Sequence, residues 1–207
     1  GDNRFEVDVL SGQKTGAYLD YRSFRFAARE FARGKCLDAF CYQGWFSCQI
    51  APFADDVTSI DSSANAIETA RRNAIINDHK NVEFVRSDVF DYLSECSEKF
   101  NFIHLDPPSF AKGGGKIDAA VRGYMKLINY ALKLVEDGGT ILVSSCSHNV
   151  TEGVLEKVFL QCVKKNNFEC KIIYRGIQDK DHPVLKSFPE SLYLKAIAAT
   201  IFRPASQ

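Results

Sequence analysis

The sequence predicts an α/β domain in which a mostly parallel sheet of seven strands carries helices on both faces. Short apolar runs such as 102–105 are typical of strands buried on both faces, and they alternate with longer segments of helical periodicity. A further observation locates the ligand edge of this sheet. Pro107 and Pro108 end the central run at once, which leaves Asp106 at the carboxyl end of its strand, where open α/β sheets bind ligands.

Composition is that of an ordinary globular domain and narrows the class of partner. The 207 residues are 45% apolar and 25% charged, which is enough for one large domain that is stable without disulfides or metal. Lysine plus arginine and aspartate plus glutamate number 26 each, so the charge balance argues against a protein that coats nucleic acid. A local basic patch that reads a small RNA site remains compatible with this balance.

Cysteine usage and hydropathy predict a cytoplasmic protein without a metal site or a membrane segment. The seven cysteines include no C-x-x-C pair, which favours a reduced compartment over a disulfide framework or a zinc site. No apolar run is long enough to cross a bilayer, and the N-terminus lacks a signal-peptide pattern. Because the chain begins with Gly1, we expect it to be part of a longer protein.

The N-terminal part predicts a strand, a turn and a helix. Apolar and polar side chains alternate over residues 4–10, and residues 11–16 have the composition of a turn. Asp20 is expected to cap a helix whose apolar stripe begins at Phe24. The arginines of this helix are expected on a solvated face, apart from Arg22, which lies beside Asp20.

Two strands then predict the start of a nucleotide-binding sheet. A strand over 35–40 leads through a turn that contains Gly44 into a helix, where a glycine lets a ligand approach the backbone. The turn is no G-x-G-x-x-G fingerprint, which disfavours a dinucleotide. Asp61 ends the next strand, 57–61, about 20 residues beyond the turn, where an acid accepts hydrogen bonds from ribose hydroxyls.

The third strand end completes this pattern. A helix over 62–77 precedes a strand over 82–85. Asp88 then either caps the following helix, or accepts a hydrogen bond from an adenine amino group while Val89 packs on the ring. Three successive strand ends with this spacing together predict a cleft for an adenosyl ligand.

The chain after Asp106 brings a cysteine to the same sheet edge. A glycine-rich loop over 111–116 is followed by a helix over about 118–135 and a strand over 140–144. Cys146 follows this strand, so we expect it on the strand next to that of Asp106.

The C-terminal segments complete the sheet. A helix is predicted near 151–165, and strands near 170–175 and 193–202 are expected to form an antiparallel hairpin at the sheet edge. The loop segments 181–184 and 188–191 lie between them and are expected to cross the top of the sheet.

These motifs together resemble the bacterial SAM-dependent cytosine-C5 methyltransferases that act on large-subunit ribosomal RNA. The segments that carry the resemblance are Asp38–Gly44, Asp61, Asp106–Phe110 and Ser145–Ser147, extended by Gly12–Gly16, Asp20, Arg22 and Asp181–Val184. The resemblance implies a class I SAM-dependent methyltransferase fold, which is Rossmann-like. Members carry a small RNA-binding PUA domain and a β-hairpin before this fold. Here residues 1–22 are expected to be a hairpin remnant that closes the cofactor site, and residues 23–207 the methyltransferase domain.

The resemblance also implies the ligands and the side chains around them. S-adenosyl-L-methionine (SAM) would lie over the Gly44 turn and leave as S-adenosyl-L-homocysteine (SAH). The cofactor-binding residues would be Tyr18, Asp20, Arg22, Phe40, Tyr42, Gly44, Phe46, Asp61, Ser62, Asp88, Val89 and Asp106, and the RNA-binding residues Pro107, Phe110, Lys112, Arg122 and His148. One departure is Trp45, where the family usually has a second glycine. Its indole either narrows the methionine end of the pocket or points into the core.

The chemistry of cytosine methylation assigns roles to two residues as hypotheses. Carbon 5 of cytosine becomes nucleophilic when a thiolate, here Cys146, adds to carbon 6. Asp106 would hydrogen-bond N3 or the amino group and stabilise the charge that develops. The base that removes the carbon-5 proton is left unassigned, with a water held by Asp106 or His148 as one candidate. The alternative for Cys146 is a small buried residue.

Other functions remain open from the sequence alone. A methyltransferase acting on a base nitrogen such as guanine N7 would share the Asp-Pro-Pro turn and need no cysteine. A non-catalytic RNA-binding module would keep a vestigial SAM cleft, and an NAD-dependent oxidoreductase is disfavoured by the single-glycine turn. The candidate basic patch consists of Lys112, Lys116, Arg122 and Lys126, with a solvated helix face as its alternative. The oligomeric state is also open, including a homodimer.

Overall fold

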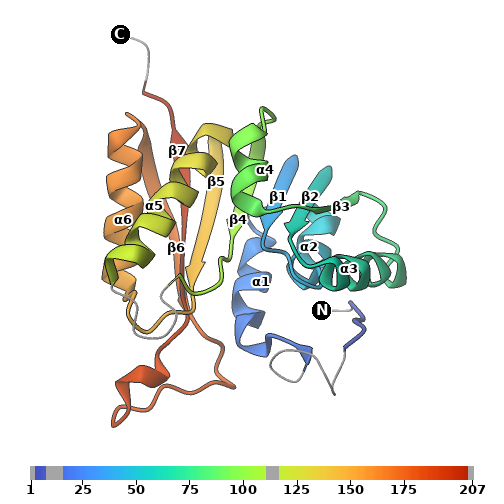
Figure 1. Ribbon diagram of the computed structural model, residues 1–207, viewed down its shortest axis with the longest axis horizontal. Coiled ribbons are helices and arrows are strands. Elements are labelled where there is room, and N and C mark those ends of the chain that lie inside the picture. The colour runs from blue at the N-terminus through green and yellow to red at the C-terminus, as the bar shows by residue number, and fades with distance from the viewer. Residues whose placement is uncertain (1–2, 8–15, 111–116, 205–207) are drawn as a thin grey trace.

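One sheet runs through the domain. The computed structural model describes residues 3–7, 16–110 and 117–204, and within them seven strands pair in the order β3-β2-β1-β4-β5-β7-β6 (Figure 1). The strands are β1 Lys35–Ala39, β2 Asp56–Asp61, β3 Val82–Arg86, β4 Phe100–Leu105, β5 Val135–Ser145, β6 Glu169–Ile177 and β7 Lys195–Phe202. This is the strand order of the class I methyltransferase fold, as predicted.

The strand directions confirm the mostly parallel sheet. Strands β1 to β5 pair in parallel, whereas β7 runs antiparallel to both β5 and β6. The predicted edge hairpin is therefore present and consists of β6 and β7. The antiparallel strand β7 lies inside the sheet, and β6 forms the edge. Strand β4 lies between β1 and β5, so the residue that follows it stands between the two halves of the sheet.

Helices connect the strands, and three of those in the described ranges begin at side-chain caps. The α-helices are α1 Arg22–Ala28, α2 Trp45–Ile50, α3 Ala64–Ile76, α4 Val89–Glu95, α5 Ile117–Leu134 and α6 Glu152–Lys165, and the 3-10 turns include η2 Leu19–Tyr21, η3 Ala51–Phe53 and η4 Pro189–Ser191. Ser63, Asp88 and Thr151 accept hydrogen bonds from backbone N–H groups in the first turns of α3, α4 and α6. No helix in the described ranges combines the length and apolar character that crossing a bilayer requires.

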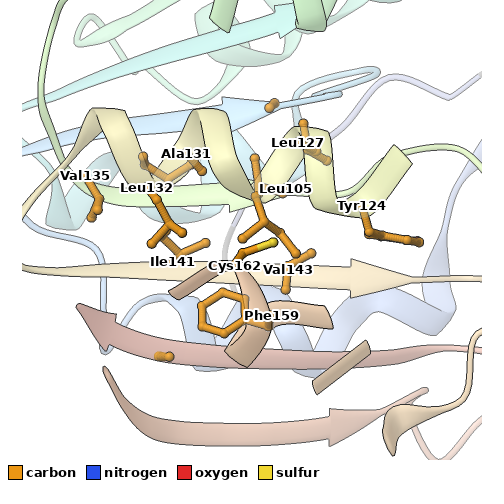
Figure 2. Close-up of a cluster of buried hydrophobic side chains, with 14 of the residues drawn as sticks. Leu105, Tyr124, Leu127, Ala131, Leu132, Val135, Ile141, Val143, Phe159 and Cys162 are labelled. Atoms are coloured by element: carbon orange, nitrogen blue, oxygen red, sulfur yellow. The ribbon is translucent and has the colours of Figure 1, made fainter. Parts of the chain in front are cut away.

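The helices bury both faces of the sheet. Side chains of α4, α5 and α6 pack on one face, and Figure 2 shows Leu132 of α5 beside Ile141 of β5 there, with Leu127 and Phe159 in the same cluster. Helices α1, α2 and α3 cover the other face in two smaller clusters. Because helices cover both faces of the sheet, the central strands are apolar runs in which apolar and polar residues do not alternate.

The N-terminal segment differs from its prediction. Residues 4–7 form no strand, and residues 8–15, which complete the expected strand and turn, lie outside the described residues. The segment is held by side chains instead: Asn77 exchanges hydrogen bonds of 2.7 Å with the backbone of Arg4, and Phe5 stacks on Trp45 with ring centroids 4.3 Å apart. The partly buried Trp45 indole therefore meets the N-terminal segment, and its predicted effect on the methionine end of the cofactor pocket stays a prediction.

Candidate active site

The carboxyl ends of the parallel strands gather the predicted residues at one edge. The loop after β1, Asp61 at the end of β2, Asp106 after β4 and Cys146 after β5 all lie there. Register places them at similar heights, because Ala39 pairs with both Ile60 and Leu105. The segment between β6 and β7 extends beyond the same edge (Figure 1).

The loop after β1 has an unusual backbone. Phe40, Tyr42 and Gly44 have φ values of 68°, 48° and 75°, so every second residue is left-handed. For residues other than glycine this conformation costs free energy and is concentrated at functional sites. A Cβ at Gly44 would lie 2.9 Å from the Cβ of Ala70, so packing against α3 requires this glycine. The predicted approach of a ligand to the Gly44 backbone is a separate role and stays a prediction.

Asp61 holds this loop in place and keeps acceptor capacity. One carboxylate oxygen accepts a hydrogen bond from Tyr42 N (3.0 Å), and the other accepts one from Ser63 N (2.9 Å). Each oxygen retains a further lone pair, which fits the hydroxyls of a ribose. Ser62, the next residue, is exposed at the same edge.

Asp88 has one oxygen engaged and one available. Its Oδ1 accepts hydrogen bonds from Phe90 N (2.8 Å) and Asp91 N (3.2 Å), which confirms the helix cap. Among the described residues Oδ2 has no protein partner, so it is open to an amino group. The predicted adenine contact of Asp88 therefore remains a prediction.

Two of the expected cofactor contacts are buried side chains. Val89 is 2% exposed and packs in the cluster beneath α4 and α5. Phe46 is 5% exposed and stacks on His104 with centroids 3.5 Å apart. Both follow a loop at the sheet edge and lie in the first turn of a helix, which directs their side chains into the core. A contact of either residue with the cofactor stays a prediction.

The segment before α1 joins the cofactor loop to the long loop between β6 and β7. Asp20 is 3% exposed and accepts a hydrogen bond of 2.7 Å from the Tyr193 hydroxyl, so the prediction that it caps α1 is wrong. Arg22 Nε pairs with Asp179 (2.6 Å). The Tyr18 ring meets Tyr42 edge-on at 5.5 Å. Residues 18–22 therefore lie against the loop after β1, as a segment that closes the site would.

Asp106 is held by a neighbouring strand. The Ser144 hydroxyl donates a hydrogen bond of 2.5 Å to Asp106 Oδ1. Burial raises the pKa of this carboxyl above its usual range, while the nearby His104 and the Ser144 hydrogen bond oppose the rise. The side chain can therefore hold a proton at a pH where an exposed aspartate has lost it.

A buried hydrogen-bond network that the sequence did not predict reaches Asp106 from below. Asp38 accepts a hydrogen bond from His104 Nδ1 (2.7 Å) and one from the Ser47 hydroxyl (2.5 Å). His104 Nε2 bonds the Tyr21 hydroxyl (2.8 Å), and Tyr21 interacts electrostatically with Ser144 and Asp106. Polar residues inside apolar strands could have indicated this network from the sequence. Such residues are buried only when they are hydrogen-bonded, so each needs a buried partner.

Cys146 directly follows β5, the strand next to the one that Asp106 follows. It is partly exposed, whereas Cys36, Cys41, Cys48 and Cys162 are buried, which argues against the alternative of a purely structural cysteine. It interacts electrostatically with Tyr18, Tyr124, Tyr193 and Lys195.

The expected RNA contacts differ in exposure. Phe110 is partly exposed, packs edge-on against Tyr124 at 5.1 Å and covers Gly123, and its contact with RNA stays a prediction. Pro107 is buried, while Arg122 and His148 are exposed. Lys112 and Lys116 lie outside the described residues. Within the described ranges no cluster of three or more His, Cys, Asp or Glu side chains is placed to hold a metal ion.

Comparison with known proteins gives the family. The methyltransferase small domain family matches residues 24–174. The chain is 37% identical over 204 residues to ribosomal RNA large subunit methyltransferase I of Aeromonas hydrophila subsp. hydrophila, covering 95% of this chain and 51% of that protein. It is 36% identical over 202 residues to the Escherichia coli strain SMS-3-5 protein of the same name, covering 94% and 51%. The chain thus spans about half the length of these curated relatives.

Solved structures show the same fold. A Streptococcus mutans structure described as a SAM-dependent methyltransferase has a TM-score of 0.78 at 24% identity, covering 89% of this chain and 49% of that one. SMU.776, described as a methyltransferase complexed with SAH, has the same TM-score and identity and covers 89% and 50%. The chain therefore belongs to the methyltransferase small domain family and has the class I fold, with SAM as its cofactor.

Proposed function

We propose that this chain is the methyltransferase domain of an enzyme that forms 5-methylcytosine in large-subunit ribosomal RNA, with Cys146 as nucleophile. The observation that carries the proposal is the position of Asp106 and Cys146 just beyond the ends of the neighbouring strands β4 and β5. Ser144, two residues before Cys146, donates a hydrogen bond to Asp106. The similarity to ribosomal RNA large subunit methyltransferase I supports the substrate. Such an enzyme would act in the cytoplasm, with residues 1–22 as the segment that closes its cofactor site.

The cofactor would be held by the three strand ends and the N-terminal segment. Asp61 offers acceptors to the ribose hydroxyls, and Asp88 Oδ2 offers one to the adenine amino group. Phe40 and Tyr42 present partly exposed rings from the strained loop, against which Tyr18 lies edge-on. This set of acceptors and rings fits an adenosyl group. The cofactor supplies the electrophilic methyl group.

In the proposed reaction Cys146 acts first. Its thiolate adds to carbon 6 of cytosine, and the ring electrons that move to carbon 5 make that carbon nucleophilic. Asp106, whose pKa is raised by burial, can donate its proton to N3 as negative charge develops there. After methylation a water molecule takes the carbon-5 proton. N3 returns its proton to Asp106 as the C5=C6 double bond forms again, and the C6–S bond breaks with its electron pair going to Cys146, which leaves as a thiolate.

The test is methyl transfer from labelled SAM to large-subunit ribosomal RNA. Wild type and Cys170→Ala, which changes another partly buried cysteine on β6, should label cytosine carbon 5, and Cys146→Ala should not. Nucleoside mass spectrometry identifies the position. Equal labelling by Cys146→Ala would rule out the thiolate mechanism, and label on a guanine nitrogen would replace the proposed activity by nitrogen methylation. SAH binding without any transfer to RNA would favour the non-catalytic module.

A further inference from the structure

A lysine that no sequence pattern singled out is buried next to Cys146. Lys195 begins β7 and pairs across the strand with Ser145, the residue before Cys146. Its side chain is 3% exposed. Nζ donates hydrogen bonds to the backbone oxygens of Ser147 (2.6 Å) and Val150 (2.7 Å), so it fixes the turn that follows Cys146.

The charge on this lysine has no carboxylate partner. In the described part of the chain, no Asp or Glu oxygen lies within 4.0 Å of Lys195 Nζ, although buried charges are ordinarily paired. An ammonium group has three N–H donors, and the two carbonyls use only two of them. Burial lowers the pKa of Lys195 to about 8, and the interaction that opposes this effect is with Cys146.

Three tyrosine hydroxyls also interact electrostatically with Cys146. Tyr18 comes from the N-terminal segment, Tyr124 from α5 and Tyr193 from the loop before β7. Burial raises the pKa of each above the ordinary value, so none is ionised near pH 7. The carboxyl of Asp106 lies in the same region and is negatively charged only above its raised pKa. Lys195 is therefore a cation that interacts with the thiol.

We propose that Lys195 is the counter-ion that keeps Cys146 in its thiolate form. The proton leaves the sulfur, the electron pair of the S–H bond stays there, and the amine of Lys195 or solvent takes the proton. Lys195 is thus a positioning residue that sets both the turn and the charge of the nucleophile. The inference rests on the proposed function only in taking Cys146 as that nucleophile.

The test measures the thiolate directly and needs neither RNA nor cofactor. The rate of Cys146 alkylation by iodoacetamide is followed against pH and quantified by peptide mass spectrometry. In wild type the half-maximal rate should lie below the pKa of about 8.5 of a free thiol. Lys195→Met should shift the midpoint upward by about one unit, which slows alkylation at pH 7 about tenfold. Lys195→Arg, which keeps the charge, should stay near wild type.

Cys170 in the same samples is the internal control and should be unaffected by the substitutions at position 195. An unchanged Cys146 profile in a folded Lys195→Met variant would overturn the inference, and so would a wild-type profile like that of a free thiol. If circular dichroism shows that Lys195→Met does not fold, the pH profiles of Cys146 alkylation in wild type and in Lys195→Arg test the inference. A midpoint at the free-thiol value in both would overturn it. A lowered midpoint in a protein that transfers no methyl group would uphold the counter-ion while rejecting the proposed function.

Discussion

Asp106 illustrates how a single residue at the sheet edge can oppose stability while serving chemistry. Its carboxyl is desolvated at the end of β4, and the Ser144 hydrogen bond compensates only part of that cost. The raised pKa means that the folded protein binds a proton there more tightly than the unfolded chain does. The site therefore carries an ionisation penalty at neutral pH.

Asp106→Asn should stabilise the fold at pH 7 and abolish methyl transfer. In wild type, stability falls as pH rises from about 3.9, the unfolded pKa, through the raised folded pKa, and the penalty then stays constant. Asparagine has no such penalty. At a pH above the raised folded pKa of Asp106, the unfolding free energy of the variant should therefore exceed that of wild type by about 1 kcal/mol, which corresponds to about 2–4 °C in melting temperature. Thermal denaturation between pH 4 and 8 checks this, and equal melting temperatures throughout would contradict it.

A second residue-scale prediction concerns the buried pair of Asp38 and His104. His104→Leu leaves the Asp38 carboxylate buried without its partner and should cost about 3–5 kcal/mol of unfolding free energy. Tyr21→Phe removes one hydrogen bond from the same network and should cost about 1 kcal/mol. Urea denaturation gives both values.

The matched control for Tyr21→Phe is Tyr174→Phe. Both rings meet Phe24 edge-on, but Tyr174 lies on β6, outside the network. A loss for Tyr174→Phe as large as that for Tyr21→Phe would show that the network contributes nothing specific.

At the scale of elements, the start of α4 combines a cap with a cofactor acceptor. Asp88→Asn should leave the cap intact, because asparagine caps helices as well as aspartate does and Oδ1 makes both backbone bonds. It replaces Oδ2 by an NH₂ group, which should weaken SAH binding about tenfold, the equivalent of about 1.4 kcal/mol. Asp88→Ala should lose the cap as well, at about 1 kcal/mol. Calorimetry with SAH and melting curves separate the two effects, and unchanged SAH affinity in Asp88→Asn would assign Asp88 to the cap alone.

The elements were predictable because their signals are local. Apolar runs, a serine cap at Ser63 and glycines at segment ends each depend on neighbouring residues, and the strand order follows from the family resemblance. The network was not predictable, because Asp38 and His104 are 66 residues apart and no local pattern pairs them. Lys195 was missed for the same reason: its two carbonyl partners are 48 and 45 positions away.

Side-chain direction was the other limit. Val89 and Phe46 follow loops that were placed correctly, but whether a side chain in the first turn of a short helix faces a cleft or the core depends on the angle between helix and sheet. No sequence periodicity reports that angle over six or seven residues. The burial of these two side chains was therefore not predictable from the sequence.

At the scale of the whole molecule, the cofactor should act as a cross-link between segments. Its proposed contacts come from the N-terminal segment and from the ends of β1, β2 and β3, so one bound molecule would connect all of them. SAH at 100 times its Kd should therefore add about 2.7 kcal/mol of stability, or about 5–10 °C in melting temperature. Asp61→Asn at the same SAH concentration should show a much smaller shift. Equal shifts in thermal denaturation would exclude Asp61 from the cofactor site.

The stacking of Phe5 on Trp45 has a consequence for spectroscopy. The chain contains a single tryptophan, and its indole contacts Phe5 at 4.3 Å and the Arg25 guanidinium at 5.4 Å. Intrinsic fluorescence excited at the indole band therefore reports on the seating of the N-terminal segment against α2. Release of that segment would expose the indole to water and move its emission to longer wavelength. An unlabelled sample thus carries its own optical reporter for the N-terminal segment.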